Sequence, residues 1–300
     1  MKKLLPVFAF LSWFASAATA SAEAPYEGIA KPWQLGFQEA ASPVMEKLTH
    51  MHDLLLVIIT AITVLVLVAL TYICIRFRRS RNPIPSKTTH NSLLEVIWTG
   101  IPILILVVIA IPSLRLHYFM EKVVDPELTV KVVGYQWYWH YEYPDNGGFG
   151  FDSYMKKDNL APGEHRLLAV DNRVVVPVDT TVRLLITGAD VIHAFAVPAL
   201  GVKRDAVPGR LNESWFKAEK IGTYYGQCSE LCGVGHGFMP IVIDVVSKED
   251  FAKWVKTKQP AGASIPAEEK PAEKQPSKKP RINKSAPANP KDALQPTAAE

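Results

Sequence analysis

Residues 228–239 read Cys-Ser-Glu-Leu-Cys-Gly-Val-Gly-His-Gly-Phe-Met, so two thiols, an imidazole and a thioether fall within twelve consecutive positions. Such a soft ligand set favours copper over magnesium or calcium. Zinc accepts two cysteines and a histidine, but a thioether gives no reason to choose zinc. Gly233, Gly235 and Gly237 allow the backbone to bend tightly around a small ion. The stretch therefore predicts a copper-binding loop.

Two cysteines on one loop can each bridge two copper ions, which gives a compact core that shares one electron over both metals. A second imidazole is needed to complete such a pair. His193 is the candidate, although a single histidine is more often an ordinary polar residue; it lies in the stretch 190–198, where we expect a strand to end. The predicted ligands of a binuclear copper site are His193, Cys228, Cys232, His236 and Met239.

The alternative for Cys228 and Cys232 is a disulfide, the usual state of a cysteine pair in an exported protein. Their separation of four residues would close a loop too small to stabilise the fold much. A disulfide would also leave the neighbouring His236 and Met239 unexplained, so we favour a metal. The third cysteine, Cys74, lies in an apolar run, where we interpret it as a small hydrophobic side chain.

Two uncharged apolar runs, 54–75 and 96–114, are each long enough to cross the ~30 Å hydrocarbon core of a membrane as a helix. The alternative is a pair of buried core helices, but uncharged runs of this length are rare in soluble domains. Pro102 lies inside the second run and either kinks that helix or falls within its first turns at little cost. We therefore predict a transmembrane hairpin.

The charges around the hairpin predict its orientation. Short positive loops stay in the cytoplasm, so both ends of the hairpin and the chain after Leu116 are expected on the outer side. That side is the periplasm in a Gram-negative bacterium, and the chain is then a two-helix protein of the inner membrane. The cations of the connecting loop are Arg76, Arg78, Arg79, Arg81 and Lys87.

The N-terminus agrees with export. Lys2 and Lys3 precede the apolar stretch 4–14, and Ala-Ser-Ala at 20–22 fits a cleavage site, so residues 1–22 are predicted to be a signal peptide. The alternative is a short third membrane helix, but the apolar core is too short for one.

The rest of the chain predicts one folded domain and a tail. Residues 23–120 form an outer N-terminal segment and the hairpin, and in residues 121–250 short apolar stretches alternate with turns, which is typical of an all-β sandwich or barrel. Residues 259–300 are rich in Pro, Ala, Lys and Glu and predict a disordered tail. The net charge of +4 does not suggest nucleic-acid binding. Expected strands include Thr129–Val133, Arg166–Val170, Thr181–Thr187 and Pro240–Val246.

Several longer motifs follow one another between about His50 and Val246, namely Gly134–Trp139, Phe151–Met155, Asp205–Asn212 and Tyr224–Cys228. With the hairpin they closely resemble subunit II of the haem–copper cytochrome c oxidases, in the form found in alphaproteobacteria and mitochondria. The resemblance implies a cupredoxin-like Greek-key domain that holds a binuclear copper A centre. It implies that the backbone carbonyl of Glu230 joins the copper ligands, and that the Glu230 carboxylate binds magnesium at the boundary with subunit I.

The resemblance also implies roles outside the copper loop. Trp137 matches the tryptophan at which electrons enter, whereas for Trp139, Tyr141 and Tyr143 we keep the ordinary interpretation of core packing. Glu95 by itself suggests only a favourable contact with a helix N-terminus, but it matches the acid at the mouth of a proton pathway into subunit I. Three acids match positions that dock the basic face of cytochrome c: Glu142, Asp152 and Asp190.

The implied function is to take electrons from reduced cytochrome c and pass them through copper to haem in subunit I, where oxygen is reduced to water and protons are translocated. Subunits I and III and cytochrome c are the implied partners. The stretch 145–150 is poor in acids, so docking is expected to be weaker or more salt-sensitive. The absence of a Cys-x-x-Cys-His motif excludes a fused haem c domain.

Three other functions remain as alternatives. A copper-delivery module must release its metal, and five ligands on one site argue against that. The quinol-oxidising form of subunit II lacks the copper ligands that this sequence has. A nitrous-oxide-reductase-like domain shares the copper loop but lacks a two-helix anchor of this kind.

Overall fold

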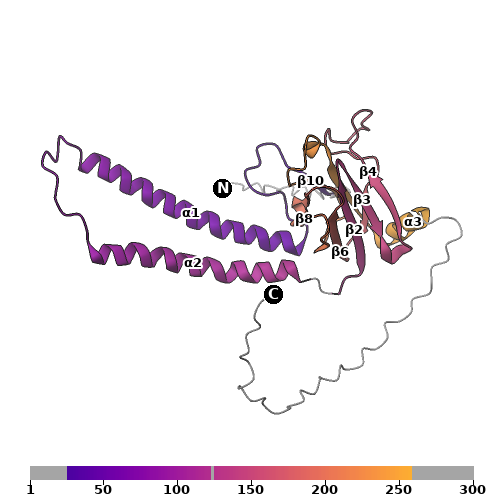
Figure 1. Ribbon diagram of the computed structural model, residues 1–300, viewed down its shortest axis with the longest axis horizontal. Coiled ribbons are helices and arrows are strands. Elements are labelled where there is room, and N and C mark those ends of the chain that lie inside the picture. The colour runs from indigo at the N-terminus through magenta and orange to yellow at the C-terminus, as the bar shows by residue number, and fades with distance from the viewer. Residues whose placement is uncertain (1–25, 123–124, 259–300) are drawn as a thin grey trace, which may run out of the picture. The chain divides into compact units, whose positions relative to one another are not determined.

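The computed structural model describes residues 26–122 and 125–258. The predicted signal peptide and the predicted disordered tail both lie outside the described residues. A short strand, β1 (Tyr26–Gly28), comes first and is followed by two long helices, and the remaining strands of the β domain come after the helices (Figure 1).

Both long helices begin at a residue whose side chain caps the helix. Helix α1 spans Pro43–Arg76, and the hydroxyl of Ser42 accepts a hydrogen bond from the backbone N of Met45 at 3.1 Å. Helix α2 spans Ser92–Glu121, and the side-chain oxygen of Asn91 accepts from the backbone N of Leu94, also at 3.1 Å. Such caps satisfy backbone N–H groups that have no partner inside the helix. The helices lie side by side (Figure 1).

The apolar side chains of α1 and α2 are exposed along the length of the hairpin. The most apolar 18-residue window of each helix has none of its residues buried by the rest of the chain. Core helices of a soluble protein would bury these windows, so the alternative of buried core helices does not hold. Pro102 and Pro112 both lie within α2, which continues through them.

The β domain contains two sheets. One has the strand order β5-β11-β10-β7-β8, with β1 added in parallel beside β10, and the other has the order β4-β3-β2-β6-β9. The strands of the first are β1 (Tyr26–Gly28), β5 (Val174–Pro177), β7 (His193–Val197), β8 (Val202–Ala206), β10 (Gly222–Cys228) and β11 (Pro240–Val246). Those of the second are β2 (Leu128–Tyr135), β3 (Tyr138–Tyr143), β4 (Phe149–Ser153), β6 (Thr181–Gly188) and β9 (Asn212–Lys217).

One hydrophobic core joins the two sheets. Strand β3 shows how the sequence builds it, because Trp139, Tyr141 and Tyr143 alternate along the strand and all three are fully buried. Trp139 meets Phe195 of β7 edge to face, with ring centroids 5.4 Å apart. The predicted packing role of these three aromatic residues is confirmed, and so is the cupredoxin-like β-sandwich.

Helix α3 (Lys248–Lys258) closes one side of this core. Its Trp254 lies with its ring centroid 5.2 Å from that of Tyr143 and 5.6 Å from that of Phe149. The chain also forms three short 3-10 helices, η1 (Pro144–Asn146), η2 (Pro198–Leu200) and η3 (His236–Phe238).

One local prediction is wrong. Arg166–Val170 is a series of turns and not a strand, because Leu167 has a positive φ of 69° and the backbone N of Leu168 donates to His165; only Val170 makes an isolated bridge, to Met155. The apolar stretch 166–170 was read without knowledge of its pairing partner. The expectation that a strand ends within 190–198 is confirmed, because β7 ends at Val197, and His193 is the first residue of that strand.

Tyr141 and Tyr143 provide a matched test of the core. The Tyr143 hydroxyl donates to the carbonyl of Val175 at 2.9 Å and accepts from its N–H at 3.1 Å, whereas the buried Tyr141 hydroxyl has no hydrogen-bond partner among the described residues. We expect Tyr143→Phe to lower the free energy of unfolding by about 1–3 kcal/mol, because it leaves buried groups unpaired. Tyr141→Phe should leave that free energy unchanged or raise it slightly.

Urea unfolding followed by tryptophan fluorescence measures both values. Equal losses of unfolding free energy in the two variants would contradict the stabilising role assigned to the hydrogen bonds of Tyr143.

Candidate metal centre

The pairing of two strands assembles the site from distant parts of the chain. Strand β10 ends at Cys228, which pairs with Phe195 of β7, and the next backbone N–H, from Ser229, donates to the carbonyl of Ala194 at 3.0 Å. The first residue of β7, His193, is thereby brought to the end of β10. The loop from Ser229 to Met239 then returns to β11 and carries the remaining predicted ligands.

The donor atoms lie at distances that suit a shared metal site. The Cys228 and Cys232 sulfurs are 3.8 Å apart, too far for a disulfide, whose sulfurs lie about 2.05 Å apart. Nδ1 of His193 lies 4.0 Å from the Cys228 sulfur, and Nδ1 of His236 lies 3.7 Å from the Cys232 sulfur. Ligands about 2.0–2.3 Å from a tetrahedral ion lie roughly 3.3–3.8 Å from one another. The donors therefore fit around metal and do not form a disulfide.

Met239 and the carbonyl of Glu230 complete the cluster. The Met239 sulfur lies 3.6 Å from the Cys232 sulfur, and the Glu230 carbonyl oxygen lies 3.3 Å from the Cys228 sulfur. Met239 is 1% exposed, and its backbone carbonyl accepts a hydrogen bond from the Trp139 indole at 3.1 Å. The site therefore offers two cysteine sulfurs, one thioether sulfur, two imidazoles and one carbonyl, the donor set of a binuclear copper site and a poor one for magnesium or calcium.

Asp190 holds the imidazole of His193 in place. Its carboxylate accepts a hydrogen bond from Nε2 of His193 at 2.9 Å, so that Nδ1 faces the sulfurs. The same carboxylate accepts from the backbone N–H groups of Val191 and Gln136, each at 2.7 Å. Burial raises the pKa of Asp190, but these three hydrogen bonds outweigh burial and leave the pKa lowered. A carboxylate that fixes the far nitrogen of a ligating histidine is a common feature of metal sites.

The two thiols differ in acidity. Burial alone would raise the pKa of Cys228, but hydrogen bonds from His193 and from neighbouring backbone groups outweigh it and lower that pKa to about 6. For Cys232, burial and the charge of Cys228 act in the same direction and raise the pKa to about 12. Without metal, the pair therefore holds one thiolate and one thiol at neutral pH.

Trp137 is attached directly to the metal loop. Its indole N–H donates to the carbonyl of Cys232 at 3.1 Å, and the side-chain amide of Gln136 donates to the same oxygen at 2.8 Å. The ring is half-buried and packs against Gly235, where an added Cβ would lie 2.3 Å from ring atoms. Gly235 is therefore required by the close approach of Trp137. Gly233, in contrast, has a positive φ of 115° and serves the turn of the backbone.

Family models match most of the described chain. A model of the periplasmic domain of cytochrome c oxidase subunit II matches residues 128–246, and one of the transmembrane domain of that subunit matches residues 30–116. The chain belongs to the cytochrome c oxidase subunit II family. It is therefore a membrane protein with two transmembrane helices and a periplasmic domain, and its cysteine loop is a copper A-type site.

Relatives from bacteria and eukaryotes support the assignment to this family. The probable cytochrome c oxidase subunit 2 of Rickettsia bellii is 59% identical over 78% of this chain and 87% of the relative. The cytochrome c oxidase subunit 2 of Phytophthora megasperma is 50% identical over 77% of this chain and 89% of the relative. A crystal structure of the periplasmic domain of cytochrome oxidase subunit II from Bradyrhizobium japonicum also matches, with a sequence identity of 60% and a TM-score of 0.44. The match covers 46% of this chain and 96% of the chain in that structure.

Other predicted site residues of this subunit II chain lie away from the copper ligands. Glu142 forms an ion pair with Lys131 at 3.0 Å, and Asp152 binds His140 at 2.6 Å, both on the β2-β3-β4 strands. Glu95 lies in the first turn of α2, at the opposite end of that helix from the β domain. The roles predicted for Glu142, Asp152 and Glu95 remain predictions.

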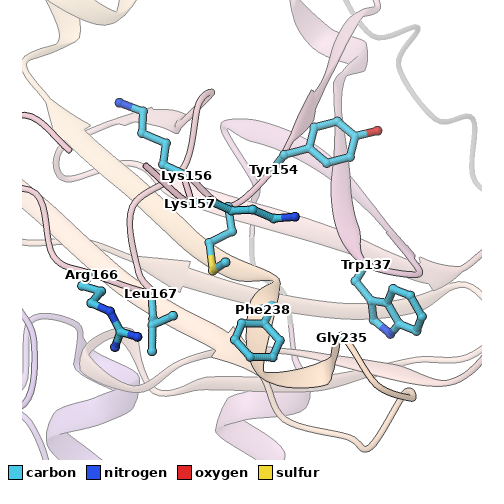
Figure 2. Close-up of a pocket in the computed structure, with 9 residues that line it drawn as sticks. Trp137, Tyr154, Lys156, Lys157, Arg166, Leu167, Gly235 and Phe238 are labelled. Atoms are coloured by element: carbon cyan, nitrogen blue, oxygen red, sulfur yellow. The ribbon is translucent and has the colours of Figure 1, made fainter. Parts of the chain in front are cut away.

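A surface hollow of about 680 Å³, which was not predicted from the sequence, lies beside Trp137 (Figure 2). Its wall includes Tyr154, which stacks on Tyr138 with centroids 4.5 Å apart, and Phe238 of the metal loop. Lys157 and Arg166 also line it, and neither has an ion pair among the described residues. The surface next to Trp137 therefore carries positive as well as negative charge. Figure 2 shows Trp137 and Phe238 on either side of Gly235.

Asp190 and Asp152 were predicted to share a docking role, and substitution separates them. We expect Asp190→Asn to weaken copper binding about 10–100-fold and to change the absorption spectrum of the copper site, because it loosens His193. Asp152→Asn should leave the spectrum unchanged and raise KM for cytochrome c. Absorption spectra and steady-state kinetics of the two variants measure this. An unchanged spectrum with Asp190→Asn would contradict the role of the carboxylate.

Copper loading should depend on pH. Because the pKa of Cys232 lies far above neutrality, its proton must leave when copper binds. We expect the affinity of the reduced, metal-free protein for copper to rise about tenfold per pH unit between roughly pH 6.5 and 8, and a proton to be released. Competition titrations in weakly buffered solution measure both. An affinity that does not change with pH would contradict the assigned protonation states.

Proposed function

We propose that this chain is the subunit that accepts electrons for a respiratory cytochrome c oxidase, taking them from reduced cytochrome c and delivering them to haem in subunit I. Oxygen is then reduced in subunit I, and this chain has no complete oxygen-reducing site of its own. The observation that carries the proposal is the cluster of two cysteine sulfurs 3.8 Å apart with His193 beside them.

The proposed copper ligands are His193, Cys228, Cys232, His236, Met239 and the carbonyl of Glu230. A copper pair in this site would accept and release one electron at a time. The protein contributes a rigid, buried environment, since Cys228 is 6% and Cys232 is 3% exposed. Such burial limits solvent reorganisation, and it argues against a delivery module, which must release its metal to a partner.

Trp137 is the proposed contact between the electron donor and the site. Its ring lies partly at the surface while its N–H is bonded to the carbonyl of Cys232, one of the proposed ligands. Tyr138 and Tyr154 form a stacked pair in the same region and extend the aromatic surface. Such a surface suits a transient apolar contact with an exposed haem edge.

The mixed charges around Trp137 are suited to orienting the electron donor more than to binding it tightly. The three proposed docking acids, Glu142, Asp152 and Asp190, are each already bound to a cation or imidazole of this chain. Lys157 adds a positive charge nearby. Complementary charge mainly raises the association rate. We therefore replace the more salt-sensitive docking expected from the acid-poor stretch 145–150 by a docking rate that depends less steeply on salt than an all-acidic face would give, because fewer uncompensated charges are screened.

The metal loop is also proposed to contact subunit I. Leu231 and Val234 are 79% and 88% exposed, and Phe238 is 51% exposed, which places three apolar side chains on the surface of one short loop. Exposed apolar residues of this kind mark protein interfaces. Glu230 lies on the same loop with its side chain exposed, so magnesium bound there would take its other oxygen ligands from subunit I and water.

The proposed membrane arrangement follows from the hairpin. The loop between α1 and α2 carries the excess of Arg and Lys and lies on the cytoplasmic side of the inner membrane. The copper domain and both ends of the mature chain then lie in the periplasm, where the donor is found. Glu95 lies at the cytoplasmic end of α2, which is the side from which protons enter in the proposed pathway into subunit I. Subunit III is a further proposed neighbour.

Substituting Trp137 tests the route of the electron. We expect Trp137→Leu to slow the first electron transfer from reduced cytochrome c at least about tenfold, with copper content and spectrum unchanged. Trp137→Phe keeps an aromatic ring but loses the bond to Cys232 and should give an intermediate rate. Stopped-flow oxidation of cytochrome c by the purified oxidase measures these rates. A wild-type rate for Trp137→Leu would contradict the role.

A further inference from the structure

A hollow of about 350 Å³ lies between α1 and α2, at the end of the hairpin that adjoins the β domain. One face of each helix lines it, because in each helix the lining residues are spaced i, i+3, i+4 and i+7. They are Lys47, His50, Met51 and Leu54 from α1, and Pro112, Arg115, Leu116 and Phe119 from α2.

The hollow is basic and contains no acid. Neither Lys47 nor Arg115 has an anionic partner in the described part of the chain, and the ammonium group of Lys47 lies only over the ring of Phe119, 5.1 Å from its centroid. The acids of the same helix ends, Glu46 and Asp53, do not line the hollow. Glu121, at the end of α2, is bound to Arg204 at 2.7 Å. The two cations are therefore available to an external anion.

The depth at which these residues lie in the membrane suggests which anion they bind. The apolar runs end near Leu54 and Leu114, and Lys47 lies seven residues before Leu54, which is about 10 Å along the helix. The headgroup layer is roughly 5–8 Å thick on each side of the hydrocarbon core. His50, about 6 Å before Leu54, and Arg115, next to Leu114, therefore lie within the headgroup layer, and the long side chain of Lys47 reaches this layer from its outer edge. The apolar side chains of the hollow lie at the level of the first acyl carbons.

We propose that this hollow binds one anionic phospholipid of the outer leaflet of the membrane. Lys47 and Arg115 pair with its phosphate groups, and the His50 imidazole donates a hydrogen bond to them. Leu54 and Leu116 contact the upper part of the acyl chains. A free phosphate ion would leave this apolar floor uncovered. Basic pockets between transmembrane helices are suited to anionic lipid headgroups.

The test counts lipids that stay bound to the intact, detergent-purified oxidase, by native mass spectrometry after titration with phosphatidylglycerol. We expect the double variant Lys47→Gln/Arg115→Gln to bind one phosphatidylglycerol about 25-fold more weakly than the wild type, since each cation contributes about fivefold. Lys122→Gln is the matched control, because it removes a cation from the same end of α2 that does not line the hollow. It should bind as the wild type does.

Parallel titrations distinguish the sources of the anion. Phosphatidylcholine should bind more weakly than phosphatidylglycerol, and inorganic phosphate should not displace the lipid. Equal affinity in the double variant and the wild type would overturn the proposal, as would binding of phosphate alone. Loss of subunit I from the double variant, with no bound lipid in the wild type, would show that the cations face a protein partner and would also overturn it. An unchanged copper spectrum in all variants shows that the electron-accepting site is intact.

Discussion

The pairing of β7 with β10 is the interaction on which the metal site depends. It sets Cys228 opposite Phe195, so that His193, 35 residues earlier than Cys228, reaches the same end of the sheet. Successive side chains of a strand point to opposite faces, and a slip of one residue would turn the thiol or the imidazole away from the other. The other ligands lie on a single loop whose ends are fixed by β10 and β11. A long-range register therefore decides whether the site exists.

The supports of the metal site and of Trp137 are the same few contacts. Asp190 binds the imidazole of His193 on one side and the backbone N–H of Gln136, the residue before Trp137, on the other. The Cys232 carbonyl then accepts from the Trp137 indole. The ring at the surface and the ligands beneath it are thus held in one hydrogen-bonded unit. A donor that contacts this ring meets a surface whose position is tied to the metal site.

How much could be predicted from the sequence depended on how local each feature is. The ligand types within 228–239 and the spanning helices could be predicted, because spacing and run length are local patterns. The supposed strand Arg166–Val170 failed, because apolar composition does not report the positive φ of Leu167. The role of Asp190 at the imidazole was missed for a related reason: the hydrogen bond at 2.9 Å depends on how the turn before β7 folds. The docking role expected for it was implied only by the resemblance to the family.

The electron paramagnetic resonance spectrum of the copper-loaded protein, taken with its copper content, tests most directly whether Cys228 and Cys232 hold a copper pair. Their sulfurs are 3.8 Å apart, with one imidazole beside each. We expect two coppers per chain and, in the oxidised state, a mixed-valence signal in which one unpaired electron is shared equally by two copper nuclei. One copper per chain with a signal from a single nucleus, or no copper bound when both cysteines are reduced, would contradict the binuclear site.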